Sequence, residues 1–100
     1  MRVTLQYFDD CPNWTETDRH LRILGLEYPE LEVMYRKVDT PELAETIGFR
    51  GSPSIIIDGV DPFAAVSAPV GLSCRVYPTP DGLVGSPTLE QLREVIERSE

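Results

Sequence analysis

The sequence predicts one α/β domain over residues 1–100, and three observations support that class. Residues 1–8 alternate apolar and polar side chains with the period of two that is typical of a strand. Residues 54–57 are mostly isoleucine, as expected of a buried central strand. Residues 12–24 and 89–96 carry apolar side chains at helical spacing. The predicted order is strand, helix, strand, helix, strand, loop, strand and helix, and 100 residues fit a single domain.

The first helix is predicted to begin at Cys11 or Pro12, because proline is favoured in the first turn of a helix. Trp14 and Leu24 belong to its apolar stripe, and Gly25 is a typical end signal. The residues that follow return to alternation, which predicts a second strand over 31–38.

A short second helix is expected after this strand. Thr40 is a good N-cap, Pro41 fits the first helical turn, and Gly48 marks the end. The stretch 60–80 contains four prolines and no sustained period, so we expect an irregular connection with a functional role. Residues 81–85 are predicted to form a short strand.

The last helix has two alternative starts. Ser86 can cap it, with Pro87 in the first turn, or Thr88 and Gln91 can form a capping box. Its charged residues are interpreted as a solvated face.

Composition narrows the function classes. The net charge is −8, from 9 basic and 17 acidic residues, which argues against binding to nucleic acid or to anionic membranes. The first residues lack the apolar core of a secretory signal, and no apolar run is long enough to span a bilayer. We therefore expect a cytoplasmic protein whose two cysteines are mostly thiols. No cysteine and histidine cluster has zinc spacing, so neither a metal site nor a cofactor is predicted.

Two motifs resemble the thioredoxin-like superfamily. One is Cys11 within the run Phe8-Asp9-Asp10-Cys11-Pro12-Asn13-Trp14, at a strand-to-helix junction, and the other is the turn that leads through residues 47–52 to Pro53. The resemblance covers residues 1–59 and the final helix, but not 60–80. It implies a thioredoxin-like fold with a four-stranded mixed sheet, about three flanking helices and an irregular insertion before the last strand. The first two strands would be parallel, and strand 54–57 would run antiparallel to the first.

The resemblance has one departure. The redox motif of the family holds two cysteines separated by two residues, and Trp14 stands at the second position here. A disulfide within the motif is therefore excluded. Monothiol glutaredoxin-like and peroxiredoxin-like members exist, and some members of the superfamily have lost activity.

Cys11 is the candidate nucleophile. Amide groups at a helix N-terminus favour a thiolate, whereas Asp9 and Asp10 disfavour it, and the fold would bring Arg50 nearby. We expect at least the edge of the Cys11 sulfur to be exposed. The alternative is an inert cysteine packed at the start of a helix.

The candidate binding residues are Pro12, Trp14, Ser52 and Pro53. The resemblance implies a cis bond between Ser52 and Pro53, facing Cys11. The backbone just before this proline would pair with an extended thiol-bearing partner as an edge strand does. Trp14 is read either as a wall of the substrate groove or as a core residue.

Cys74 lies within the irregular connection, and it is read either as a buried small side chain or as a resolving thiol. Ten extended residues reach about 33 Å, whereas a strand spans about 17–20 Å, so the loop can return to the active-site edge. We therefore predict a reversible Cys11–Cys74 disulfide. The function expected is thiol–disulfide exchange with a protein or a low-molecular-weight thiol. The alternative is a non-catalytic module that binds a protein partner or a soft metal ion.

Overall fold

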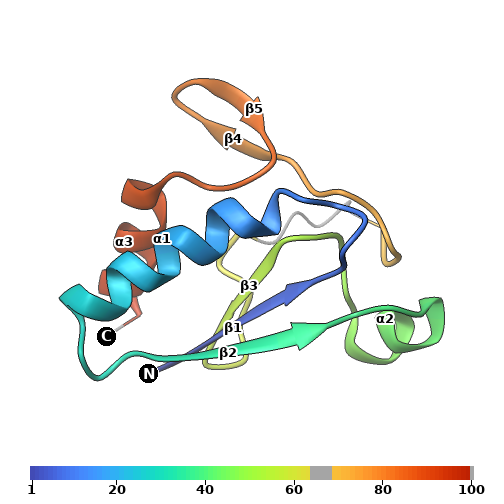
Figure 1. Ribbon diagram of the computed structural model, residues 1–100, viewed down its shortest axis with the longest axis horizontal. Helices are drawn as coiled ribbons and strands as arrows, with labels where there is room; N and C mark the ends of the chain where they lie inside the picture. Colours follow the sequence, from blue (N-terminus) through green and yellow to red (C-terminus); the bar gives the residue numbers. More distant parts are fainter. Residues whose placement is uncertain (64–68, 100) are drawn as a thin grey trace.

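The computed structural model describes residues 1–63 and 69–99, which form five strands and three helices (Figure 1). In chain order the elements are β1 (Arg2–Tyr7), α1 (Trp14–Glu27), β2 (Glu32–Lys37), α2 (Pro41–Ile47), β3 (Ser54–Ile57), β4 (Tyr77–Thr79), β5 (Gly82–Val84) and α3 (Leu89–Arg98). None of these helices combines the length and the apolar composition that crossing a bilayer requires.

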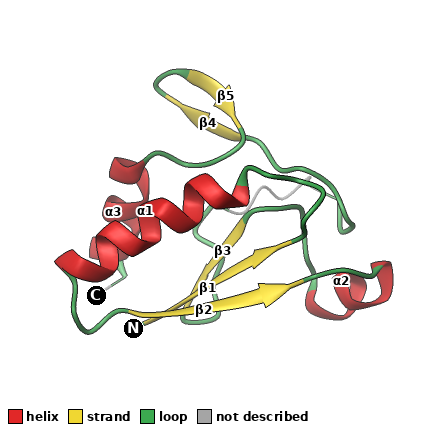
Figure 2. Cartoon of the chain, in the orientation of Figure 1, coloured by secondary structure: helices red, strands yellow, loops and turns green. Residues whose placement is uncertain are grey.

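The main sheet has the strand order β2-β1-β3 (Figure 2). β1 pairs in parallel with β2, where Val3 lies opposite Val33. β1 also pairs antiparallel with β3, where Leu5 lies opposite Ile55. Both pairings confirm the predicted directions. The shared strand β1 ends at Tyr7, so the chain leaves the middle of the sheet just before Cys11.

The prediction of a four-stranded sheet is wrong. β5 is a strand, as expected, but it pairs with β4 in a separate two-stranded sheet that stands apart from β1–β3 in Figure 1. β3 is therefore an edge strand rather than a central one. A turn that ends at Gly82, with φ +102°, folds β5 back on its chain neighbour β4. Pro78 in β4 has no N–H to donate, which suits a strand at an edge.

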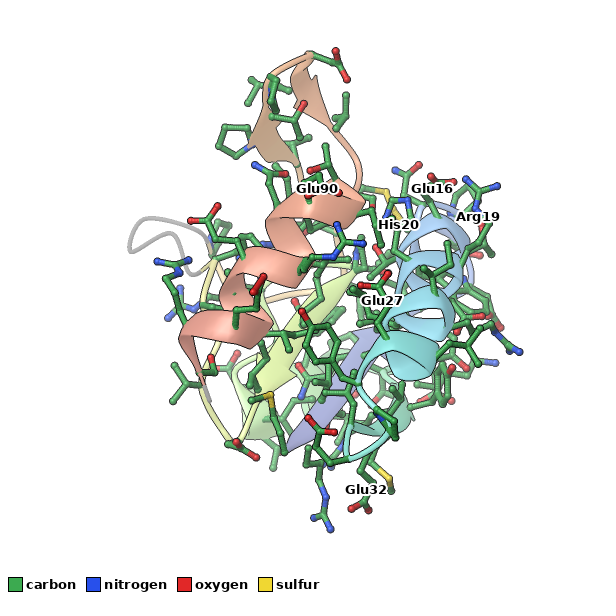
Figure 3. The ribbon with its side chains drawn as sticks, turned by 90° about the vertical axis from the view of Figure 1, so that its left-hand side faces the viewer. Glu16, Arg19, His20, Glu27, Glu32 and Glu90 are labelled. Atoms are coloured by element: carbon green, nitrogen blue, oxygen red, sulfur yellow. A yellow bond between two sulfur atoms is a disulfide. The ribbon has the colours of Figure 1, made fainter. Side chains whose placement is uncertain are left out.

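Two helices cover one face of the sheet. Figure 3 looks onto α1 and α3, which lie side by side, with Glu27 of α1 paired to Arg93 of α3 at 2.8 Å. The core beneath them consists of buried apolar residues from the sheet, both helices and β4: Val3, Leu5, Leu21, Leu24, Ile55, Ile57, Tyr77, Leu92, Val95 and Ile96. Removing this apolar surface from water is the main source of stability, and it fixes β1 and β3 under α1.

A second cluster lies where β2 leads into α2. It is formed by Val38, Ala44 and Phe49. Val70 and Leu72, which precede Cys74, pack against it. The backbone of Phe49 also accepts a 2.9 Å hydrogen bond from the Gly71 N–H. The returning loop is thereby tied to the same end of the sheet as Cys11.

The first helix begins and ends later than predicted. α1 starts at Trp14 with Asn13 as its N-cap, so Cys11 and Pro12 lie in the turn before the helix. The Thr15 N–H donates to the Pro12 carbonyl at 3.1 Å within this turn. The helix continues past Gly25 to Glu27, because a glycine inside a helix weakens it without ending it.

The predicted caps of the other helices are confirmed. The Thr40 side chain accepts the Leu43 N–H at 3.1 Å, and Gly48 is left-handed with φ 71°. For α3, the structure decides between the two predicted starts. Thr88 and Gln91 form the reciprocal capping box, with hydrogen bonds of 2.9 and 3.1 Å.

Candidate redox site

Cys11 and Cys74 form a disulfide bond across 63 positions of sequence, with their Cα atoms 5.7 Å apart. Cys11 comes from the turn between β1 and α1, and Cys74 from the segment that precedes β4. The bond confirms the predicted pairing of these two residues. The bonding partner of Cys11 is thus a cysteine of the irregular connection.

The two halves of the disulfide differ in exposure. Cys11 is fully buried, whereas Cys74 is exposed. The expectation of an exposed Cys11 sulfur is therefore wrong. The disulfide and two backbone hydrogen bonds to Ser52 place the segment Ser73–Arg75 next to Cys11.

A groove of about 630 Å³ opens beside Cys74. Phe63, Val76 and Gln91 line it, together with Arg50, which the sequence predicted near the thiols. A small molecule in this groove would meet Cys74 and not Cys11.

Ser52 forms the floor of the site. It is fully buried, and its bond to Pro53 is cis, as expected. The Ser52 N–H donates to the Ser73 carbonyl at 2.8 Å, and the Ser52 carbonyl accepts the Arg75 N–H at 2.9 Å. Ser52 and Cys74 thus form a parallel β-bridge. The backbone predicted to receive an extended partner is occupied by the protein's own chain.

Gly51 permits this close approach. Its φ is +114°, a conformation that side chains rarely adopt. A Cβ at this position would lie 3.1 Å from the Arg75 Cβ and 3.2 Å from the Ser73 carbonyl oxygen. The sequence marked residues 51–53 only as a turn, so this requirement was not predicted.

Arg75 is the functional residue that the sequence did not reveal. Its side chain is 7% exposed, and it forms a two-pronged pair with Asp61 at 2.7 and 3.4 Å. It also donates to the Phe63 carbonyl at 2.5 Å and to Ser54 Oγ at 3.3 Å. A buried cation needs such partners, because leaving it unpaired costs several kcal/mol. The signal in the sequence was an arginine next to Cys74 in an otherwise uncharged stretch.

Tyr77 supports both Arg75 and the cis proline. Its hydroxyl donates to the Pro53 carbonyl, and the Arg75 guanidinium lies 4.7 Å from its ring centre. Burial raises the pKa of the Tyr77 phenol above its usual value, so the group stays protonated and keeps its donor.

The other predicted binding residues lie at the edge of the site. Trp14 stacks on Tyr7 with ring centres 4.3 Å apart and packs against the main core, which favours the core interpretation. Pro12 is exposed in the turn beside Cys11. Of the predicted site residues, the structure therefore brings together Cys11, Cys74, Ser52 and Pro53.

The charges near Cys11 are partly compensated. Asp9 is paired with the Lys37 ammonium at 2.6 Å. This hydrogen bond raises the pKa of Lys37 and keeps a positive charge beside the turn. The repulsion that Asp9 would exert on a Cys11 thiolate is therefore reduced.

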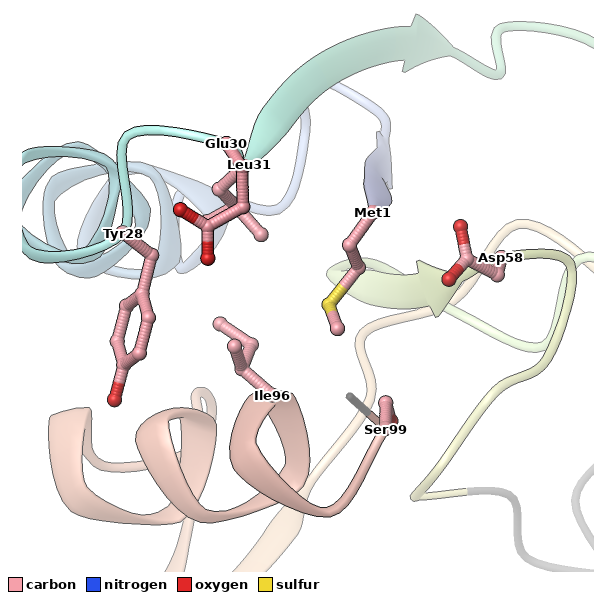
Figure 4. A pocket seen from close by; sticks show the side chains of 7 residues that line it. All are labelled: Met1, Tyr28, Glu30, Leu31, Asp58, Ile96 and Ser99. Atoms are coloured by element: carbon pink, nitrogen blue, oxygen red, sulfur yellow. The ribbon is translucent and has the colours of Figure 1, made fainter.

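Two other features of the described residues bear on ligand binding. In residues 1–63 and 69–99, no three histidine, cysteine or acidic side chains gather as metal ligands would. A pocket of about 310 Å³ lies beside Met1, Leu31 and Ile96, among the residues of Figure 4. It sits at the start of β1, the opposite end of that strand from Cys11.

Comparisons with family models, with curated proteins and with solved structures give no match to this chain. What the site does is therefore inferred from its own residues and geometry.

Proposed function

We propose that this protein is a thiol–disulfide redox protein in which Cys74 exchanges with an external thiol and Cys11 opens or closes the internal disulfide. The observation that carries the proposal is the asymmetry of the bond: one sulfur belongs to an exposed residue in a groove, and the other to a fully buried one. Thiolate attack requires access to the sulfur that is attacked. In this proposal Cys74 is the cysteine that reacts with the external thiol and Cys11 is the resolving cysteine, the reverse of the roles expected from the sequence.

The steps balance as ordinary thiol–disulfide exchange. An external thiolate attacks the sulfur of Cys74, a new S–S bond forms there, and the Cys11–Cys74 bond breaks to leave a Cys11 thiolate. A second external thiolate attacks the mixed disulfide, releasing an external disulfide and a Cys74 thiolate. Two external thiols are oxidised and one protein disulfide is reduced, and the reverse sequence reoxidises the protein.

The surroundings of Cys11 suit a leaving thiolate. Cys11 lies in the turn that leads into α1, two positions before the N-cap Asn13, and the positive end of a helix dipole favours a nearby anion. The pairing of Asp9 with Lys37 reduces the repulsion that Asp9 would exert on this thiolate. The position of Cys11 beside Ser52 and the cis Pro53 is also what the resemblance to the thioredoxin-like superfamily implies.

The experiment is a redox titration. The protein is equilibrated in buffers of a small thiol and its disulfide, quenched with acid, alkylated and weighed by mass spectrometry. We expect a reversible transition between a closed pair and two free thiols, with the circular dichroism of the fold retained. The matched variant Cys74→Ser should show no such transition.

A disulfide that opens only in denaturant would contradict the proposal. The pair would then be a static cross-link in a binding module, which is the alternative named from the sequence. Capture of a soft metal ion by the reduced pair is measured in the same samples by adding the ion before alkylation.

A further inference from the structure

Both backbone hydrogen-bonding groups of Ser52 are already used. The segment Ser73–Arg75 accepts from one and donates to the other, and Cys74 between them is bonded to Cys11. An extended peptide that adds to such an edge needs these same two groups. The chain therefore holds its own cysteine-bearing segment in the position where a peptide partner would bind.

This segment has an anchor that does not depend on the disulfide. Arg75 is buried, pairs with Asp61 through two hydrogen bonds and donates to Phe63 and Ser54. Pulling the segment away would break a buried ion pair and leave its charges without partners, which is strongly unfavourable. None of these contacts involves a sulfur atom, so reduction removes none of them directly.

The approach to Ser52 is also close-packed. Gly51 allows this approach, since its φ is +114° and a Cβ there would lie 3.1 Å from the Arg75 Cβ and 3.2 Å from the Ser73 carbonyl oxygen. Tyr77, two residues after Arg75, fixes the following chain to the Pro53 carbonyl. The segment is thus held on both sides of Cys74.

We propose that Arg75 is a positioning residue that keeps Ser73–Arg75 on the Ser52 edge after reduction, so that the site exchanges with low-molecular-weight thiols and disulfides and excludes extended peptides. This inference rests on the proposed redox function and specifies its substrate class. The exchange takes place at Cys74, within the groove of about 630 Å³ beside it. Two small monothiols supply the two electrons and leave as one small disulfide.

Holding Cys74 next to Cys11 in the dithiol state also favours ring closure. Two thiols fixed near each other react as an intramolecular pair, with a high effective concentration. The reduced protein should therefore be reoxidised readily by a small disulfide. It should not accumulate as a mixed disulfide, because Cys11 is in place to displace the small thiol.

The first test uses the unmodified chain. Amide hydrogen exchange is measured by NMR in the oxidised and in the reduced protein. We expect the Ser52 and Arg75 amides to remain protected after reduction. Loss of protection at these two amides, while the amides of β1 stay protected, would overturn the inference.

The second test uses Arg75→Met and Asp61→Asn, with Arg22→Met as the matched control, since Arg22 is an exposed arginine paired with Asp18 on α1. The equilibrium constant against a glutathione redox buffer is measured for each. We expect the first two variants to disfavour the disulfide by about tenfold or more, the size of one lost anchoring interaction. The control should match the unmodified protein.

The same variants are offered a cysteine-bearing peptide disulfide and a small disulfide in parallel. The unmodified protein should react only with the small one, and the two anchor variants should gain reaction with the peptide. Equal reaction of the unmodified protein with both would overturn the inference. A disulfide that no small thiol opens would instead contradict the proposed function. If an anchor variant does not fold, the exchange measurement on the unmodified chain decides.

Discussion

Ser52 and Cys74 lie side by side in a parallel β-bridge, although 22 positions separate them, and the same Cys74 is bonded to Cys11. The backbone before the cis proline, the buried cysteine and the exposed cysteine therefore form one site. The backbone before the cis proline lies in the turn before β3. The buried cysteine follows the end of β1, and the exposed cysteine lies in the segment before β4. The stability of this arrangement and its chemistry are linked, because the disulfide joins two segments that hydrogen bonds also join.

Removing the disulfide should lower the free energy of unfolding. The bond closes a loop of 63 positions, and the chain-entropy relation gives a stabilisation of roughly 4 kcal/mol for this length. The double variant Cys11→Ser/Cys74→Ser is compared with the oxidised protein by urea denaturation. Unfolding free energies that agree within about 1 kcal/mol would show that the bond adds little beyond the anchor at Arg75.

Gly51→Ala and Gly25→Ala should change stability in opposite directions. At Gly51 the positive φ and the contact with Arg75 strain any side chain, so we expect a loss of about 1–3 kcal/mol. Gly25 lies inside α1 with nothing within 4 Å of an added Cβ, so alanine there should stabilise the helix by about 0.5–1 kcal/mol. Thermal unfolding of both oxidised variants checks the pair. A neutral Gly51→Ala would contradict the close approach of Ser73–Arg75.

Tyr77→Phe should alter stability in alkaline solution. Burial raises the pKa of the Tyr77 phenol in the folded protein above its ordinary value of 10.0. The unfolded chain therefore releases this proton first, and stability that is present below about pH 10 falls as the pH rises beyond it. The variant should lose about 1 kcal/mol at neutral pH, because the Pro53 carbonyl loses its donor.

The same variant should also show a shallower decline of stability above pH 10. Tyr35→Phe serves as the comparison, since Tyr35 is 47% exposed. Burial and the hydrogen bond to Asp18 raise the pKa of its phenol. Identical alkaline slopes for the unmodified protein and Tyr77→Phe would contradict the buried, neutral phenol.

Local signals in the sequence predicted local structure well. Thr40 and Gly48 bound α2, and Thr88 with Gln91 forms the box that begins α3, because caps depend on neighbours in the sequence. The alternation of residues 1–8 predicted β1, since one face of that strand is buried. The loop-length argument placed Cys74 near Cys11, because it needed only the reach of an extended chain.

The pairing of the last strand could not be read from the sequence. Residues 82–84 have no strong pattern, and whether they join β3 or the adjacent β4 depends on the competition between a distant and a nearby edge. The turn at Gly82 brings β5 back onto the nearby edge, which is β4. The resemblance, which implied a fourth strand in the main sheet, was wrong on this point.

The exposure of the two cysteines was also beyond the sequence. It depends on the path of residues 73–75 along Ser52, and the ion pair between Arg75 and Asp61 is one of the contacts that hold this path. Ion pairs between residues 14 positions apart in an irregular connection leave no periodic signal. The reactive order that we propose for the two cysteines rests on this path rather than on the local motif around Cys11.

The most direct measurement compares the two single-cysteine variants. Cys11→Ser leaves Cys74 as the one thiol, Cys74→Ser leaves Cys11, and each is reacted with a small chromogenic disulfide under native conditions. We expect the variant retaining Cys74 to react at least about tenfold faster, because Cys74 is an exposed residue that lines the groove whereas Cys11 is buried. Faster reaction of the variant retaining Cys11 would contradict the proposal and would identify Cys11, in the turn before α1, as the nucleophile.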